Sequence, residues 1–316
     1  MSLLQECDGK PFAQGNDSVE LRARARVNCE QLECGKILIF PGSPVELSKD
    51  DCQFLLTQRQ DGSRLHKNIS YRPKSDALRG FAAENDADTN RLHAILRDYS
   101  QRVTQFLTSF LRPYADKWSL DFASFRPLEE QGRDLPLHKR NDLLHVDAFP
   151  TRPTQGGRIL RYFTNVNPLR PRVWNSTSEP FAALAQRFAA EAGLKRFAAR
   201  GLSRSRDVWR RIRRLKRAVG LPAPDHSPYD EFMLRFHDFL KENDDLQTRW
   251  PKVHLEFPPN CSWIVFTDGV PHAVLSGQYA LEQTFIIPAT ALLAPQQSPI
   301  RILEGLCGQS LLNRAA

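Results

Sequence analysis

The stretch Leu143-Leu144-His145-Val146-Asp147-Ala148-Phe149 sets two polar residues inside a short apolar framework. This pattern predicts a β-strand that runs into a turn. Because alternate residues of a strand point to the same face of a sheet, His145 and Asp147 would present an imidazole and a carboxylate side by side. The stretch therefore predicts a rigid pair of metal ligands, to which one distant histidine would have to be added.

A second stretch, Trp263 to Gly277, supplies that histidine. It is predicted to form a strand, a tight turn and a new strand that His272 opens. Two histidines and one carboxylate hold Fe(II) on one face and leave the other positions open. We therefore predict that His145, Asp147 and His272 are the metal ligands and the catalytic centre of an Fe(II)- and 2-oxoglutarate-dependent oxygenase. Two alternatives stay open: the His-x-Asp tripeptide is common without any function, and His226 is the best rival for the third ligand.

The order of the predicted elements indicates an α+β protein with a mainly β core, folded as a double-stranded β-helix (a cupin-like jelly roll). Short strands alternate with turns in two regions, and helical patterns lie between them. We expect a single oxygenase domain over residues 1–316. Its predicted parts are an N-terminal helical support region at 1–118, the β-helix core at 119–175 and 250–290, a helical basic insertion at 178–248 and a C-terminal tail at 291–316.

Several elements have clear boundary signals. Ser43-Pro44-Val45-Glu46 is typical of a helix start, with an N-cap serine, proline at N1 and glutamate at N3. The strongest helical periodicity covers 91–112, with Asp88 or Thr89 as a possible cap and Pro113 as the stop. Strands are expected at Lys36–Phe40, Phe122–Leu128, Leu143–Phe149, Arg158–Asn165, Lys252–Phe257, Ser262–Thr267, His272–Leu275 and Ala280–Ile287.

The composition is that of an ordinary globular protein, with 41% hydrophobic and 25% charged residues among 316. Its six cysteines are scattered, which indicates reduced thiols in a cytoplasmic protein. The N-terminus has no apolar run typical of a signal peptide, and no stretch is long and apolar enough to span a membrane. The sequence does not predict an oligomeric state.

The net charge of +8 is concentrated in one segment, because residues 195–217 hold eleven Lys or Arg and one Asp. Within it, Val208, Ile212, Leu215 and Val219 share one face of a predicted helix. A basic amphipathic helix suits an anionic membrane surface. One alternative is that the apolar stripe packs on the core. Nucleic-acid binding is disfavoured, because no pattern of stacking aromatics accompanies the charge.

The far carboxylate of 2-oxoglutarate needs a cation, and a bidentate arginine is its best partner. Many enzymes of this type carry that cation shortly after the distal histidine, where this chain has Gln278. Arg161, in mid-strand, is predicted to replace it, because a buried arginine must be paired. The alternative is that Arg161 pairs with Glu282. Asn165, Arg158 and Gln278 complete the predicted co-substrate site.

Three stretches of the chain resemble the bacterial Kdo 3-hydroxylase family, in which Kdo is 3-deoxy-D-manno-oct-2-ulosonic acid, a sugar attached to lipid A. They are Leu143–Phe149, Gly157–Pro168 with Pro171–Trp174, and Phe266–Phe285, and a weaker similarity runs through Glu33–Leu38 and Ser298–Glu304.

The resemblance implies a dioxygenase that uses Fe(II), 2-oxoglutarate and O2 to hydroxylate Kdo at C3 in the lipid A inner core of lipopolysaccharide, releasing succinate and CO2. It implies that His145, Asp147 and His272 carry the metal. Such a protein would be cytoplasmic and peripheral on the inner membrane. The alternatives are an oxygenase for another substrate, such as a protein side chain, and a non-catalytic basic β-helix protein that binds membrane or nucleic acid.

Overall fold

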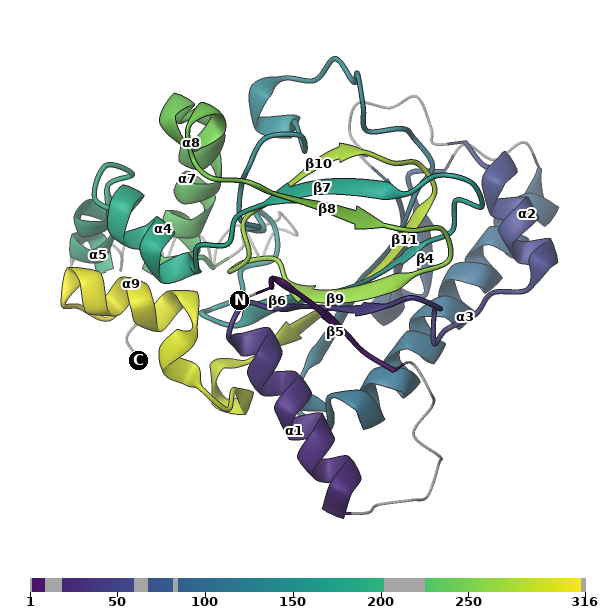
Figure 1. Ribbon diagram of the computed structural model, residues 1–316, viewed down its shortest axis with the longest axis horizontal. Coiled ribbons are helices and arrows are strands. Elements are labelled where there is room, and N and C mark those ends of the chain that lie inside the picture. Colours follow the sequence, from purple (N-terminus) through teal and green to yellow (C-terminus); the bar gives the residue numbers. More distant parts are fainter. Residues whose placement is uncertain (1, 9–18, 60–67, 82–84, 202–224, 314–316) are drawn as a thin grey trace, which may run out of the picture.

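Two β-sheets lie one above the other in the computed structural model, which describes residues 2–8, 19–59, 68–81, 85–201 and 225–313 (Figure 1). The large sheet has eight strands in the order β1-β2-β9-β6-β11-β5-β3-β4, and the small sheet has three in the order β10-β7-β8. The strands are β1 Leu4–Glu6, β2 Ile37–Phe40, β3 Ile69–Arg72, β4 Ala77–Arg79, β5 Ser119–Arg126, β6 Arg158–Asn165, β7 Arg172–Ser176, β8 Val253–Phe257, β9 Ser262–Phe266, β10 His272–Ser276 and β11 Ala280–Ile287. This is the predicted double-stranded β-helix.

Helices cover the outside of the sheets. Two of them, α1 and α3, pack on the face of the large sheet that points away from the small sheet (Figure 1). Others form a separate group beside the β-helix, with its own apolar cluster. The helices are α1 Val19–Glu33, α2 Lys49–Thr57, α3 Asp86–Phe110, α4 Phe181–Phe188, α5 Leu194–Gly201, α7 Pro228–Glu242, α8 Asp244–Thr248 and α9 Pro299–Cys307. Among those described, none has the length and apolarity that crossing a bilayer requires.

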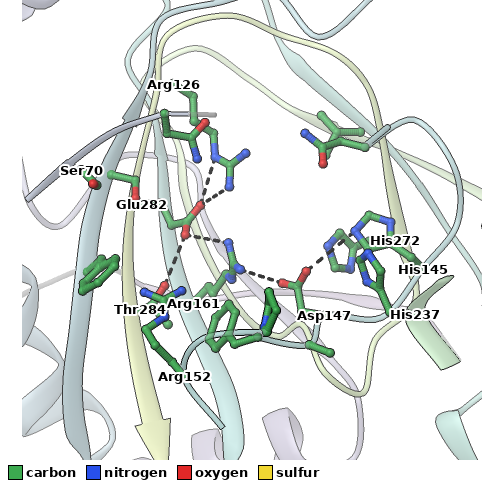
Figure 2. A pocket seen from close by; sticks show the side chains of 18 of the residues that line it. Ser70, Arg126, His145, Asp147, Arg152, Arg161, His237, His272, Glu282 and Thr284 are labelled. Atoms are coloured by element: carbon green, nitrogen blue, oxygen red, sulfur yellow. Dashed lines mark hydrogen bonds and ion pairs between the residues drawn. The ribbon is translucent and has the colours of Figure 1, made fainter. Parts of the chain in front are cut away.

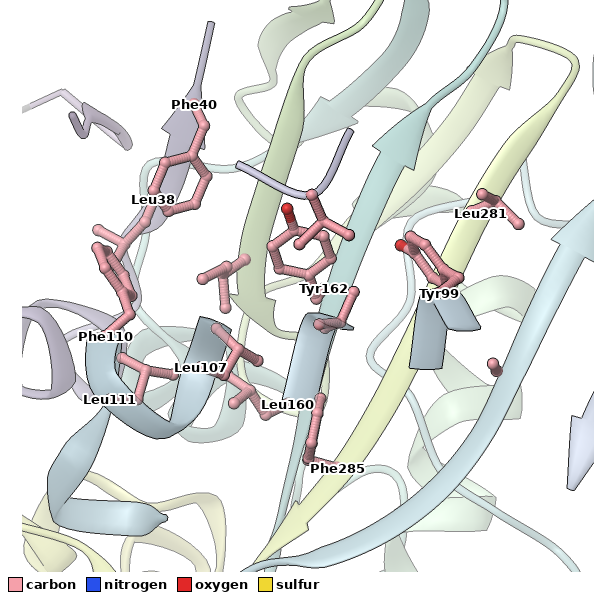
Figure 3. Close-up of a cluster of buried hydrophobic side chains, with 14 of the residues drawn as sticks. Leu38, Phe40, Tyr99, Leu107, Phe110, Leu111, Leu160, Tyr162, Leu281 and Phe285 are labelled. Carbon is pink, nitrogen blue, oxygen red and sulfur yellow. The ribbon is translucent and has the colours of Figure 1, made fainter. Parts of the chain in front are cut away.

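Strand β6 shows how the sequence divides the two faces of the large sheet. Leu160 and Tyr162 point into the helical layer, where they pack near α3 (Figure 3). Their neighbour Phe163 points the other way, between the sheets, and its ring centroid lies 5.3 Å from that of Trp174 in β7. Arg161 has the same parity as Phe163 and therefore also faces the space between the sheets.

Two predicted helix boundaries are wrong. Helix α2 begins after Ser48, whose side chain accepts a hydrogen bond from the Asp51 amide at 3.1 Å. Ser43, the predicted cap, instead forms a local turn with Val45. Helix α3 begins earlier than predicted, because Asn85 caps it. In both cases several capping residues lie close together, and the sequence alone does not show which of them the chain uses.

The segment Leu143–Phe149 is extended but is not a strand of either sheet, contrary to the prediction. A single bridge joins His145 to His272, through hydrogen bonds of 3.1 Å and 2.9 Å between their backbone groups. The Asp147 amide donates to the carbonyl of Thr267 at 2.8 Å. Leu144 and Val146 point into the apolar cluster of the helical group. The segment is therefore held between the β-helix and the helices, which fixes the direction of its polar side chains.

The predicted parts of the chain correspond only partly to observed elements. Strands β1 to β4 belong to the region predicted as helical support, so this region also contributes to the large sheet. The C-terminal region contains α9, which packs with α4 and α5. Most of the predicted basic amphipathic helix, at 202–224, lies outside the described residues.

Candidate active site

A cavity of about 590 Å³ opens between the sheets, at the end of the molecule that carries the segment 143–149. Strands β5, β6 and β11 form one wall and β7 and β10 another, while α7 closes a third side. All three predicted metal ligands, His145, Asp147 and His272, line it (Figure 2). The rival ligand His226 does not line this cavity.

The two predicted histidine ligands lie side by side, with ring centroids 4.7 Å apart. Each ring is held by a hydrogen bond to the backbone carbonyl two residues earlier in the chain. The Nδ1 of His145 lies 2.7 Å from the carbonyl of Leu143, and the Nδ1 of His272 lies 2.9 Å from that of Val270. A carbonyl only accepts, so Nδ1 must carry the proton, which leaves the Nε2 lone pair of each ring for a metal.

Asp147 completes the set. Its Oδ1 lies 3.8 Å from the Nε2 of His145, and its Oδ2 lies 3.0 Å from Nη2 of Arg161. Arg161 therefore holds one carboxylate oxygen and leaves the other directed towards the histidines. This is the outer-shell support that metal-binding carboxylates usually have.

The protonation states suit metal binding. Burial lowers the pKa of His145 well below its ordinary value, and His272 and His237 lower it further. Burial likewise lowers the pKa of His272. For Asp147 burial would raise the pKa, but the Arg161 guanidinium, followed by the two histidines, brings it below its usual range. At neutral pH the site therefore offers neutral imidazoles and an ionised carboxylate, the forms that bind a metal.

These donors fit Fe(II). Two imidazole nitrogens and one carboxylate oxygen match the donor set of non-heme iron oxygenases. His145, Asp147 and His272 would hold the ion.

A third histidine, which the sequence analysis did not select, also reaches the site. His237 lies on α7, and its ring centroid is 4.8 Å from that of His145. Its Nδ1 lies 2.8 Å from the carbonyl of Val146. Burial, followed by the charge of Lys241, lowers its pKa to about 4. The only signal in the sequence is that His237 directly follows Phe236, at the border of the apolar stripe of α7.

Arg161 has one of the two partners that the sequence analysis considered. Its Nη1 lies 2.6 Å from Oε1 of Glu282, so the predicted alternative pair exists. Glu282 is also bound by Arg126, at 2.6 Å through Oε2. Arg161 nevertheless lines the cavity, and its Nε has no hydrogen-bond partner among the described residues.

The other three predicted co-substrate residues do not line the cavity that contains the predicted metal ligands. Arg158 is buried in an ion pair with Asp268 at 2.8 Å and does not line the active-site cavity. Asn165 is fully buried, and its amide donates to backbone carbonyls of neighbouring loops, including that of Phe257. The Gln278 side chain donates to a backbone carbonyl at 2.8 Å, outside the cavity.

The cavity wall is basic. Four further arginines and one lysine line it besides Arg161, whereas only three acidic side chains do. Some of these cations are paired with acids just behind the wall. The lining cations are Arg72, Arg126, Arg152, Arg161, Arg172 and Lys241, and the acids are Asp147, Asp238 and Glu282.

Comparison with known proteins identifies the family. Residues 16–310 match the family described as 3-deoxy-D-manno-oct-2-ulosonic acid (Kdo) hydroxylase. The chain is also similar to solved structures of the Kdo hydroxylase KdoO, described as a non-heme Fe(II) alphaketoglutarate-dependent dioxygenase. The complex with alphaketoglutarate and Fe(III) is 32% identical, with a TM-score of 0.80 over 99% of this chain and 98% of that one.

Two further KdoO structures agree with this result. The complex with cobalt(II) is 32% identical, with a TM-score of 0.82 over 100% of this chain and 99% of that one. The apo structure is 33% identical, with a TM-score of 0.81 over 99% and 98%. No curated protein matched the chain. The family predicted from the sequence is confirmed: the chain belongs to the Kdo hydroxylase family.

Proposed function

We propose that His145, Asp147 and His272 hold the Fe(II) of this Kdo hydroxylase, and that the Fe(II)- and 2-oxoglutarate-dependent hydroxylation of Kdo takes place in the cavity that they line. One observation carries the proposal. Two histidines joined by a backbone bridge and one carboxylate fixed by an arginine direct their free ligand atoms into one basic cavity.

When bound, Fe(II) with 2-oxoglutarate supplies the oxidising chemistry that uses O2 to convert a C–H bond to C–OH, with release of succinate and CO2. The protein contributes geometry. The hydrogen bonds from Nδ1 to backbone carbonyls keep the imidazole rings of His145 and His272 from rotating. Arg161 keeps Asp147 ionised and oriented.

We assign Arg161 a second role towards 2-oxoglutarate. Its Nη atoms contact Glu282 and Asp147, and Arg161 lines the cavity beside the proposed metal ligands. A carboxylate placed there would gain a charge-assisted hydrogen bond.

Arg161→Lys is expected to raise the KM for 2-oxoglutarate at least roughly tenfold, because a single ammonium cannot replace a guanidinium that serves three carboxylates. Steady-state kinetics with varied 2-oxoglutarate measure this. Arg170→Lys, at an exposed arginine outside the cavity, is the matched control and should keep the wild-type KM. An unchanged KM in Arg161→Lys would remove Arg161 from the co-substrate site.

We further propose that the substrate is Kdo in a lipid A-linked precursor of lipopolysaccharide, hydroxylated at C3. The basic wall supports this, because Kdo carries a carboxylate and lipid A carries phosphates. The test supplies the purified protein with Fe(II), 2-oxoglutarate and Kdo-lipid A, and then locates the new hydroxyl group by mass spectrometry and NMR. A product that gains one oxygen at C3 of Kdo supports the assignment, whereas an oxygen elsewhere would correct it.

Association with an anionic membrane through residues 195–217 is also proposed. The described start of this segment, α5, supports it, because Phe197 is buried towards α7 while Lys195 and Arg196 are exposed. Each exposed basic residue near such a surface contributes about 1 kcal/mol.

Neutralising Arg210, Arg211, Arg213 and Arg214 together is expected to reduce co-sedimentation with anionic liposomes and activity on lipid-linked Kdo. Iron affinity should stay at the wild-type value, because the metal site lies elsewhere in the chain. Unchanged liposome binding by the neutralised variant would refute the membrane role.

A further inference from the structure

Four ligand-competent side chains meet at the site, although the facial arrangement of non-heme iron needs only three. The additional one is His237. One ligand atom each from His237, His145 and Asp147 lies within 4.8 Å of the other two, and the exposed fractions of all three residues are low or intermediate. His272 reaches the same place from β10, with its ring 4.7 Å from that of His145 (Figure 2).

The orientation of His237 favours metal binding over simple packing. The apolar residues of α7, among them Phe232, Phe236 and Leu240, point into the helical cluster, whereas His237 lines the cavity. Its Nδ1 is 2.8 Å from the carbonyl of Val146, so Nδ1 carries the proton and Nε2 has the lone pair. Among the described residues, no hydrogen-bond partner occupies that Nε2.

The same hydrogen bond from a histidine Nδ1 to a backbone carbonyl therefore occurs three times. His145, His272 and His237 each give the Nδ1 proton to a backbone carbonyl, with N to O distances of 2.7, 2.9 and 2.8 Å. The carbonyl that holds His237 belongs to Val146, the residue between two of the predicted ligands. Metal-bound histidines in proteins almost always use their second nitrogen in this way.

We propose that His237 is a fourth metal ligand of the enzyme in its co-substrate-free state. The inference rests on the proposed function of the other three residues. Three protein ligands leave three positions open on an octahedral ion, and 2-oxoglutarate with O2 needs all of them. Four protein ligands and a bidentate 2-oxoglutarate would fill all six positions, so His237 would have to release the metal before O2 binds. In the free enzyme it increases the affinity for the metal and shields a position from O2.

The test counts metal-bound imidazoles directly, with Co(II) in place of Fe(II). Each bound imidazole contributes one exchangeable N–H proton, strongly shifted by the paramagnetic ion, to the proton NMR spectrum. The proposal predicts three such signals for the wild-type protein with Co(II) alone. Two signals in the wild-type protein without 2-oxoglutarate would overturn it, whether or not any variant folds.

Two substitutions separate ligation from support of the backbone. His237→Asn keeps an N–H near the position of Nδ1, so it can still donate to Val146, but it lacks Nε2. It should lose one signal and bind Co(II) roughly tenfold more weakly. His254→Asn, at an exposed histidine of β8, is the control and should keep all signals. Wild-type affinity and an unchanged spectrum in His237→Asn would contradict the proposal.

A different set of results would refute the proposed function of the other three residues. If His145→Asn and His272→Asn leave the Co(II) signals intact, the metal lies elsewhere and the main site assignment is wrong. If those variants lose signals and His237→Asn does not, only the fourth ligand is refuted.

Discussion

Asp147→Ala should abolish Fe(II) binding and the hydroxylation of Kdo. The carboxylate is the only acidic ligand of the proposed site, and its removal leaves Arg161 close to the metal position without the charge that balances it. The loss of affinity should exceed the roughly 10–100-fold that removal of an outer-shell partner costs. Anaerobic titration with Fe(II), monitored by calorimetry, measures this loss of affinity.

The matched control is Asp98→Ala, at an exposed aspartate of α3 that pairs with Arg102 in the next helical turn. This variant should bind Fe(II) as the wild type does. His145→Ala and His272→Ala should resemble Asp147→Ala. Wild-type Fe(II) affinity in Asp147→Ala would contradict the proposed site, provided that its circular dichroism spectrum shows a folded protein.

Arg158→Met is expected to lower the free energy of unfolding by about 3–5 kcal/mol, the cost of breaking a buried ion pair from one side. Arg158 and Asp268 are each at most 2% exposed, and their side chains approach to 2.8 Å. The guanidinium also stacks on Phe266 at 4.1 Å. Without it, the carboxylate of Asp268 is buried and unpaired. Chemical denaturation monitored by tryptophan fluorescence measures the loss.

The double variant Arg158→Met with Asp268→Leu tests whether the unpaired carboxylate of Asp268 causes the loss. It removes both charges and should therefore recover much of the lost stability. Both variants should keep the wild-type KM for 2-oxoglutarate, since the pair lies outside the active-site cavity. A single variant that lost less than about 1 kcal/mol, within the range of ordinary substitutions, would show that the pair contributes little. A raised KM in a stable variant would restore the co-substrate role of Arg158.

Local periodicity predicted most of the β-helix. Strands β6 and β11 have the predicted bounds, because alternating or continuous apolar runs closed by turns encode a strand within a few residues. The segment 143–149 was predicted as a strand because its pattern alternates. It remains unpaired except at His145, since its other backbone groups bond to Thr267 and to the side chain of Gln247, a contact that no local pattern encodes.

The residues of the proposed metal site could be predicted from the sequence, whereas their surroundings could not. His145 and Asp147 are two residues apart, and the turn before His272 is a recognisable signal. His237 comes from a helix that folds back over the cavity from a separate apolar cluster, so its position depends on long-range packing. Asn165 lies at the end of β6, where its amide donates to the backbone carbonyls of Arg170 and Phe257, contacts that the local sequence pattern does not encode.

The most direct measurement is the anomalous diffraction map of crystals of this protein grown with Co(II). The proposed site predicts one strong peak in the cavity, within bonding distance of Nε2 of His145, Nε2 of His272 and Oδ1 of Asp147. A peak that these three side chains do not bind, or a cavity without a peak in crystals that hold Co(II) elsewhere, would contradict it.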